Sequence, residues 1–165
     1  MDYRKANFDI QTQQEKDLSD DSLLTNKANL EIEIQKRIAS QEIIEKFATN
    51  ALSMIENYQG KCALLNISEL YKTNFLNGAK KISPQYKLMF ASWVKMQKSE
   101  QEFLQFLNDN FEDYESKDRT ISFASTANRQ KYNELAKNVQ DVSAEVDGFQ
   151  KRGMAAVEAG KAKLK

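Results

Sequence analysis

Apolar residues recur every three or four positions over three long stretches of this chain, which is the spacing of one face of an α-helix. The first stretch starts at Ser19 or Ser22, and Gly60 follows it as a C-terminal stop, because glycine adopts the left-handed cap conformation without a Cβ clash. This pattern predicts one long helix whose apolar positions are Leu23, Leu30, Ile34, Ile44, Ala48, Ala51, Ile55 and Tyr58.

A short helix and a second long helix are predicted next. Residues 66–69, Asn-Ile-Ser-Glu, resemble a capping box before a short apolar face that ends at Asn77 and Gly78. Ser83 then stands as the N-cap of the long helix, with Pro84 at its first position, where the missing N–H loses no helical bond. The apolar positions of this helix are Met89, Trp93, Met96, Phe103, Leu107, Phe111 and Tyr114.

The last helix is predicted from a cap at Ser125 or Thr126. Before it, residues 119–123 alternate polar and apolar side chains, a pattern that fits an extended link and a bare loop equally well. The apolar positions of the last helix follow strict three-four spacing and are Tyr132, Leu135, Val139, Val142, Val146 and Phe149. We expect this helix to continue weakly through Ala156.

Together these patterns predict an all-α fold. We expect an elongated up-and-down helical bundle of three long helices and one short helix, with residues 1–18 as a polar N-terminal arm and residues 19–165 as a single helical bundle domain. A length of 165 residues suits one domain with its own core.

Composition removes several classes of function. The chain has no histidine, which is the commonest general base near neutral pH and the commonest metal ligand, so we expect no enzyme, no metal site and no cofactor. Its 24 basic and 24 acidic residues balance, which disfavours nucleic acid as a partner. No segment reads as a signal peptide or a transmembrane span. Cys62, the single cysteine, is expected to be a buried apolar residue in a chain without disulfides.

Two motifs suggest chemistry, and each has a simpler interpretation. Ser92 and Lys95 match the Ser-x-x-Lys pattern of penicillin-interacting acyl enzymes, but the accompanying Ser-Asp-Asn and Lys-Thr-Gly elements do not occur. We therefore favour an ordinary helix surface. An acidic run offers oxygen ligands, but its spacing does not fit a calcium loop and favours a solvated face: Asp109, Glu112, Asp113, Glu115 and Asp118.

Binding through apolar helix faces is the function that the sequence favours. We expect a protein partner or a second copy to bind the stripe of the last helix at Val139, Val142, Val146 and Phe149. The interrupted stripe of the first helix is a second such surface. An alternative is an apolar small molecule or lipid held inside the bundle by Met89, Trp93, Met96 and Phe103. Peripheral membrane contact is a further option that no motif supports.

The order of features between residues 65 and 149 resembles that of bacterial envelope lipoproteins of unknown function. It consists of Pro84 opening a long helix, then residues 121–123, Ile-Ser-Phe, and then residues 132–135, Tyr-Asn-Glu-Leu, in the last helix. The resemblance implies an all-helical fold and a periplasmic or cell-envelope location, with a cytoplasmic location as the alternative. Those proteins carry a lipidated N-terminal cysteine, whereas Cys62 lies far from the start. The resemblance brings no catalytic residues.

Overall fold

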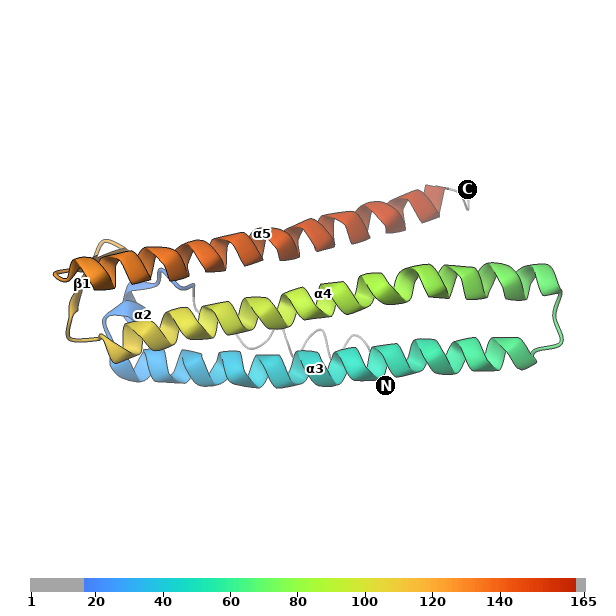
Figure 1. Ribbon diagram of the computed structural model, residues 1–165, viewed down its shortest axis with the longest axis horizontal. Helices are drawn as coiled ribbons and strands as arrows, with labels where there is room; N and C mark the ends of the chain where they lie inside the picture. The colour runs from blue at the N-terminus through green and yellow to red at the C-terminus, as the bar shows by residue number, and fades with distance from the viewer. Residues whose placement is uncertain (1–16, 163–165) are drawn as a thin grey trace.

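The computed structural model describes residues 17–162, so the predicted arm lies outside the described residues except for Asp17 and Leu18. Consecutive long helices run antiparallel, so that α4 runs opposite to α3 and α5, and together they form a rod with a small β-hairpin at one end (Figure 1). This confirms the predicted all-α helical bundle. The elements are α2 (Asp21–Leu24), α3 (Lys27–Leu64), α4 (Glu69–Asp109), β1 (Tyr114–Lys117), β2 (Thr120–Phe123) and α5 (Thr126–Ala162).

The predicted first helix is interrupted near its start. Asp20 caps the short helix α2 by accepting a hydrogen bond from the Ser22 N–H at 2.8 Å. Asn26 then caps α3 and accepts from the Ala28 N–H at 3.0 Å. The prediction of one continuous helix is therefore wrong, because two residues that favour the cap position stand only six positions apart. Within residues 17–162 the short helix is α2, and not the segment after residue 66.

Both predicted glycine stops are also wrong. Helix α3 continues through Gly60 to Leu64, and α4 continues through Gly78. No glycine in the described part of the chain has a positive φ. Glycine permits the left-handed cap conformation but does not impose it, and here packing between the two helices extends both of them.

The start of α4 differs from the prediction as well. The helix begins at Glu69 after Ser68, so Ser83 is not a cap and Pro84 lies inside the helix. An interior proline removes one backbone hydrogen bond and costs about 3 kcal/mol in an isolated helix. The contact of α4 with α3 along its length offsets this cost, which no local pattern reveals. The predicted short and long helices are thus one helix.

A β-hairpin joins α4 to α5. Helix α4 ends at Asp109, so Phe111 and Tyr114, which we expected on the helix, lie beyond it. Strands β1 and β2 pair antiparallel, with Tyr114 opposite Phe123. Asp118 and Arg119 form the turn, with φ of 50° and 62°, as a two-residue hairpin turn requires. This decides for the extended interpretation of residues 119–123. The predicted cap of the last helix is confirmed, since the Ser125 hydroxyl accepts from the Asn128 N–H at 3.3 Å.

The main core cluster lies at the hairpin end of the rod. There α2, the hairpin and all three long helices meet, and their buried side chains form one contiguous cluster. Its members are Leu23, Leu24, Leu30, Ile34, Phe103, Leu104, Leu107, Phe123 and Leu135. Toward the other end of the rod, fewer elements lie side by side (Figure 1). Cys62 is buried near the far end of α3, as expected.

A buried ion cluster joins α3 to α4 next to this core. Arg37 and Glu33 are 2% and 1% exposed, and an Arg37 Nη1 atom lies 3.2 Å from a Glu33 carboxylate oxygen. The Arg37 Nε atom lies 2.6 Å from the Glu100 carboxylate on α4. Lys36, at the edge, contacts the other Glu33 oxygen at 2.6 Å. Because a buried charge must be paired, this cluster selects one alignment of α3 against α4.

Removal of the central cation should therefore destabilise the fold strongly. We expect Arg37→Ala to lower the free energy of unfolding by about 3–5 kcal/mol, because it leaves two carboxylates facing each other in the interior. Lys36→Ala, at the solvent edge of the same cluster, should cost under about 1 kcal/mol. Urea denaturation followed by circular dichroism measures both. Equal losses for the two variants would contradict the central role of Arg37.

The two helical glycines give a test of the continuous helices. A Cβ atom added at Gly60 or at Gly78 meets no other atom within 4 Å. Because alanine favours the helix, Gly60→Ala and Gly78→Ala should each stabilise the fold by about 0.5–1 kcal/mol in thermal or urea unfolding. If these glycines ended helices in the left-handed conformation, the same substitutions would destabilise. Gly148→Ala is a control with a tighter site, since its Cβ would lie 3.3 Å from the Arg152 side chain.

Candidate interaction surface

The Ser-x-x-Lys pair lies on the face of α4 that contacts α5. The Ser92 hydroxyl donates to a Glu145 carboxylate oxygen at 2.7 Å, and Lys95 Nζ lies 3.4 Å from the other oxygen. The hydrogen bond from Ser92, aided by Lys95, lowers the pKa of Glu145. Ser92 is 4% exposed, so little of it faces solvent. These contacts link α4 to α5. This structural role explains the Ser-x-x-Lys pair without a catalytic one.

The stripe of the last helix is largely used within the bundle. Val142 and Val146 are 2% and 4% exposed, because α5 packs this face against α4. Val139 packs against the core cluster, and Phe149 is half-buried with the Arg152 guanidinium 4.6 Å from its ring centre. A partner therefore cannot reach Val142 or Val146 while the bundle is intact. This corrects the prediction that the stripe of the last helix is free to bind a partner.

Of the four residues expected around a small molecule, Phe103 packs between helices and Trp93 packs against a residue of its own helix. Phe103 is a member of the core cluster and its ring lies 5.5 Å from that of Tyr132 on α5. Trp93 packs edge-on against Phe90, with ring centres 5.8 Å apart, and Met89 and Met96 are half-buried. The Trp93 Nε1 atom is buried without a hydrogen-bond partner. Aromatic packing therefore involves Phe103 between α4 and α5 and Trp93 within α4, where its neighbour Phe90 also contacts Phe47 of α3.

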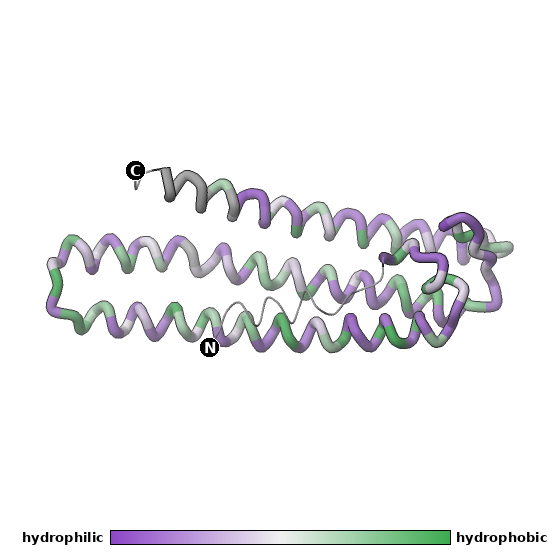
Figure 2. The backbone as a smooth tube through the Cα atoms, turned by 180° about the vertical axis from the view of Figure 1, so that it is seen from behind, coloured by the Kyte–Doolittle hydropathy of each residue, from purple (hydrophilic) through white to green (hydrophobic). Residues whose placement is uncertain are grey.

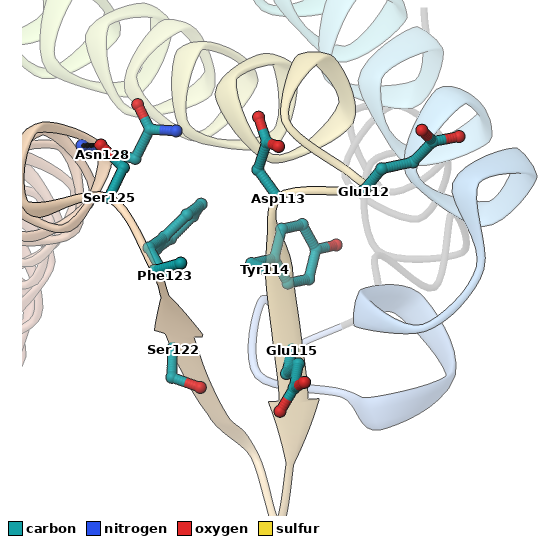
Figure 3. A pocket seen from close by; sticks show the side chains of 9 residues that line it. Glu112, Asp113, Tyr114, Glu115, Ser122, Phe123, Ser125 and Asn128 are labelled. Carbon is teal, nitrogen blue, oxygen red and sulfur yellow. Dashed lines mark hydrogen bonds between the residues drawn. The ribbon is translucent and has the colours of Figure 1, made fainter.

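The acidic run borders a cleft at the hairpin end. The cleft has a volume of about 590 Å³ and combines carboxylates from β1 and the segment before it with the aromatic rings of Tyr114 and Phe123. Figure 3 shows the carboxylates of Glu112, Asp113 and Glu115 pointing in different directions, not toward a common centre. Within the described residues, no three acidic or cysteine side chains gather as metal ligands would. The run is an acidic rim, as the solvated-face interpretation expected.

Tyr114 anchors this end of the rod. Its hydroxyl donates to the Leu24 carbonyl of α2 at 2.7 Å, and its ring lies 5.5 Å from that of Phe123. Burial raises the pKa of Tyr114 to about 12, because the phenolate would lose its hydration. Burial also raises the pKa of Tyr132 nearby.

The opposite end of the rod is apolar and exposed. Among the side chains whose exposure is described, every exposed large apolar one except Ile32 lies between residues 58 and 88. We call residues 58–75 the tip: the last turns of α3, the connection to α4 and the first turns of α4. The exposed fractions at the tip are Tyr58 57%, Leu64 87%, Leu65 52%, Ile67 44%, Leu70 67%, Tyr71 70% and Phe75 47%.

The tip is exposed because it lacks a third helix. Helix α5 diverges from α4 and ends before the α3–α4 connection (Figure 1). Figure 2 shows apolar residues in the connection itself, at the end of the rod away from the hairpin. Two helices alone cannot cover the apolar positions that a three-helix bundle would bury. Contiguous apolar exposure of this kind marks interaction sites in soluble proteins.

Charge separates along the rod although the whole chain is neutral. Residues 58–88 contain five lysines and one glutamate, a formal charge of +4: Lys61, Lys72, Lys80, Lys81, Lys87 and Glu69. Residues 109–118, at the hairpin end, contain five acidic residues and one lysine, a formal charge of −4. The rod therefore has a basic, apolar end and an acidic end. In the sequence, lysines among apolar residues between positions 58 and 88 indicate this end of the rod. It was not predicted as a surface because the same apolar residues also fit the pattern of ordinary helices.

Comparison with protein-family models, with curated proteins and with solved structures gave no match to this chain. The resemblance to envelope lipoproteins accordingly stays a prediction. Among the described helices, none combines the length and the apolar composition that crossing a bilayer requires.

A pH-dependent stability is expected from Tyr114. Its folded-state pKa lies above the ordinary value of 10, so its contribution is complete below pH 10 and is lost as the pH rises toward about 12. Tyr114→Phe should cost about 1 kcal/mol at neutral pH, since the Leu24 carbonyl loses its donor, and should reduce the alkaline loss of stability. Urea titrations at several pH values measure this. Tyr71→Phe, at an exposed site, should change neither quantity.

Proposed function

We propose that this protein is a non-enzymatic helical interaction module that attaches to a protein partner or to a second copy of itself through the tip. The observation that supports this most directly is the gathering of exposed Leu, Ile, Tyr and Phe side chains at one end of the rod. Leu64 alone is 87% exposed beside Leu65, at the very end of the molecule. Apolar area of this extent is favourable to bury, and no element within residues 17–162 covers it.

The architecture also supports a division of tasks. The core cluster, the buried ion cluster and the hairpin lie toward one end, whereas the tip lies at the other. Changes at the tip should therefore alter binding without unfolding the bundle. This proposal keeps the function that apolar helix faces predicted, and it moves the binding surface from the last-helix stripe to the tip.

Site-specific photo-crosslinking tests where the molecule attaches. We expect benzoylphenylalanine in place of Tyr71, which is 70% exposed, to form crosslinked products in the cells that produce the protein. The same amino acid in place of Ile32, 53% exposed and far from the tip, is the matched control and should give few. The readout is the mass of the products after purification under denaturing conditions.

Two further variants define the result. Leu70→Glu, combined with the crosslinker at position 71, should reduce the yield, because it places a charge on the apolar surface. Equal yields from positions 71 and 32, or no product at position 71, would contradict attachment through the tip. Circular dichroism of each variant controls for a retained fold.

A further inference from the structure

We infer that the partner of the tip is the acidic, aromatic-floored cleft at the hairpin end of a second copy of this chain, so that molecules associate head to tail. This inference rests on the proposed function and names the partner of that same surface. The two surfaces lie at opposite ends of the rod (Figure 1), so one molecule cannot join its own tip to its own cleft. Each must find its counterpart on another copy.

The chemistry of the two surfaces is complementary. The tip presents leucine and tyrosine side chains with Lys61 beside them, and the cleft presents the half-buried ring of Tyr114 with a rim of Glu112, Asp113 and Glu115. Apolar area meets apolar area at the centre and opposite charges meet at the edge, which is the arrangement of a typical interface. The rim has no cationic partner within the described residues, so its carboxylates are available to incoming lysines.

Shape favours the same pairing. The tip is the convex end of a two-helix hairpin, and the counterpart is a cleft of about 590 Å³. That volume accepts several side chains but not the whole tip, so the contact is smaller than a standard interface. We therefore expect weak association, with a Kd in about the micromolar range or above, that weakens further as salt screens the charges.

A symmetric pairing of two tips fits less well. It would bury the apolar residues equally well, but it would leave the lysines at and beside each tip, Lys61, Lys80 and Lys81, without an acidic counterpart on the other molecule. Head-to-tail contact supplies that counterpart. Such a contact is heterologous, and it extends into chains of molecules unless its rotation closes a ring.

The experiment uses two charge reversals of the full-length protein, followed by sedimentation velocity over a range of concentrations. Lys61→Glu with Lys80→Glu reverses the charge at and beside the tip, and Glu112→Lys with Glu115→Lys reverses the charge of the cleft. Each variant alone should associate about tenfold more weakly than the natural chain, or worse. Controls that reverse exposed charges elsewhere, Lys137→Glu and Glu102→Lys, should associate normally.

Two combinations give the sharpest readouts. An equimolar mixture of the tip variant and the cleft variant matches the natural tip of one with the natural cleft of the other, and the reversed tip with the reversed cleft, so it should associate about as strongly as the natural chain. The chain with all four reversals should recover association, because its two ends are again complementary. A mixture that stays monomeric, or a cleft variant that associates as well as the natural chain, would overturn the head-to-tail assignment.

The outcomes also separate this inference from the proposed function. If the natural chain stays monomeric while position 71 crosslinks to a different protein, the head-to-tail inference fails and attachment through the tip stands. Crosslinking of position 71 to lipid overturns the inference and the protein-binding function together, and so does the absence of any product with a monomeric chain. Vesicles of equal parts phosphatidylcholine and phosphatidylglycerol provide the lipid control in co-sedimentation.

Discussion

The buried contact of Arg37 with Glu33 and Glu100 sets the alignment on which the long α3–α4 hairpin depends. A guanidinium that is 2% exposed must remain opposite its carboxylates, since a shift by one helical turn would leave buried charges unpaired. With this alignment, Gln41 of α3 contacts Gln101 of α4 at 2.8 Å. Further along the same two helices, the rings of Phe47 and Phe90 lie 5.5 Å apart. The positions of the residues at the tip follow from the same register.

Stability and exposure are separated along the molecule. At the hairpin end, α2, two strands and three helices share one apolar cluster, and the Tyr114 hydroxyl joins the hairpin to α2. Toward the tip, first α5 diverges and then only α3 and α4 remain (Figure 1). Where the bundle has two helices instead of three, the apolar positions that the third helix would cover stay exposed to solvent.

The residues that the sequence suggested for catalysis or binding serve mainly to hold helices together. Ser92 and Lys95 bind the Glu145 carboxylate across the α4–α5 contact, and Val142 and Val146 complete the same contact with apolar area. The exposed apolar side chains of the tip and the acidic rim of the cleft have no such structural use among the described residues. The proposed function therefore rests on the tip, and the head-to-tail inference rests on the tip and the cleft together.

The amino-acid pattern alone determined that the chain is an all-α bundle with long helices, it placed the cap of the last helix at Ser125 or Thr126, and it identified the apolar stripe of that helix without deciding whether the stripe is buried. These are local properties, since helical periodicity and cap chemistry act within a few residues. The tertiary structure decided where helices end and which faces are covered. Gly60, Gly78 and Pro84 read as boundaries, yet packing against the neighbouring helix outweighs their local preferences of about 1–3 kcal/mol. Whether an apolar stripe is buried depends on how far a helix from a distant part of the chain extends beside it. Leu64 is exposed and Val142 is buried for this reason. Burial is a property of the assembled bundle and not of a sequence segment.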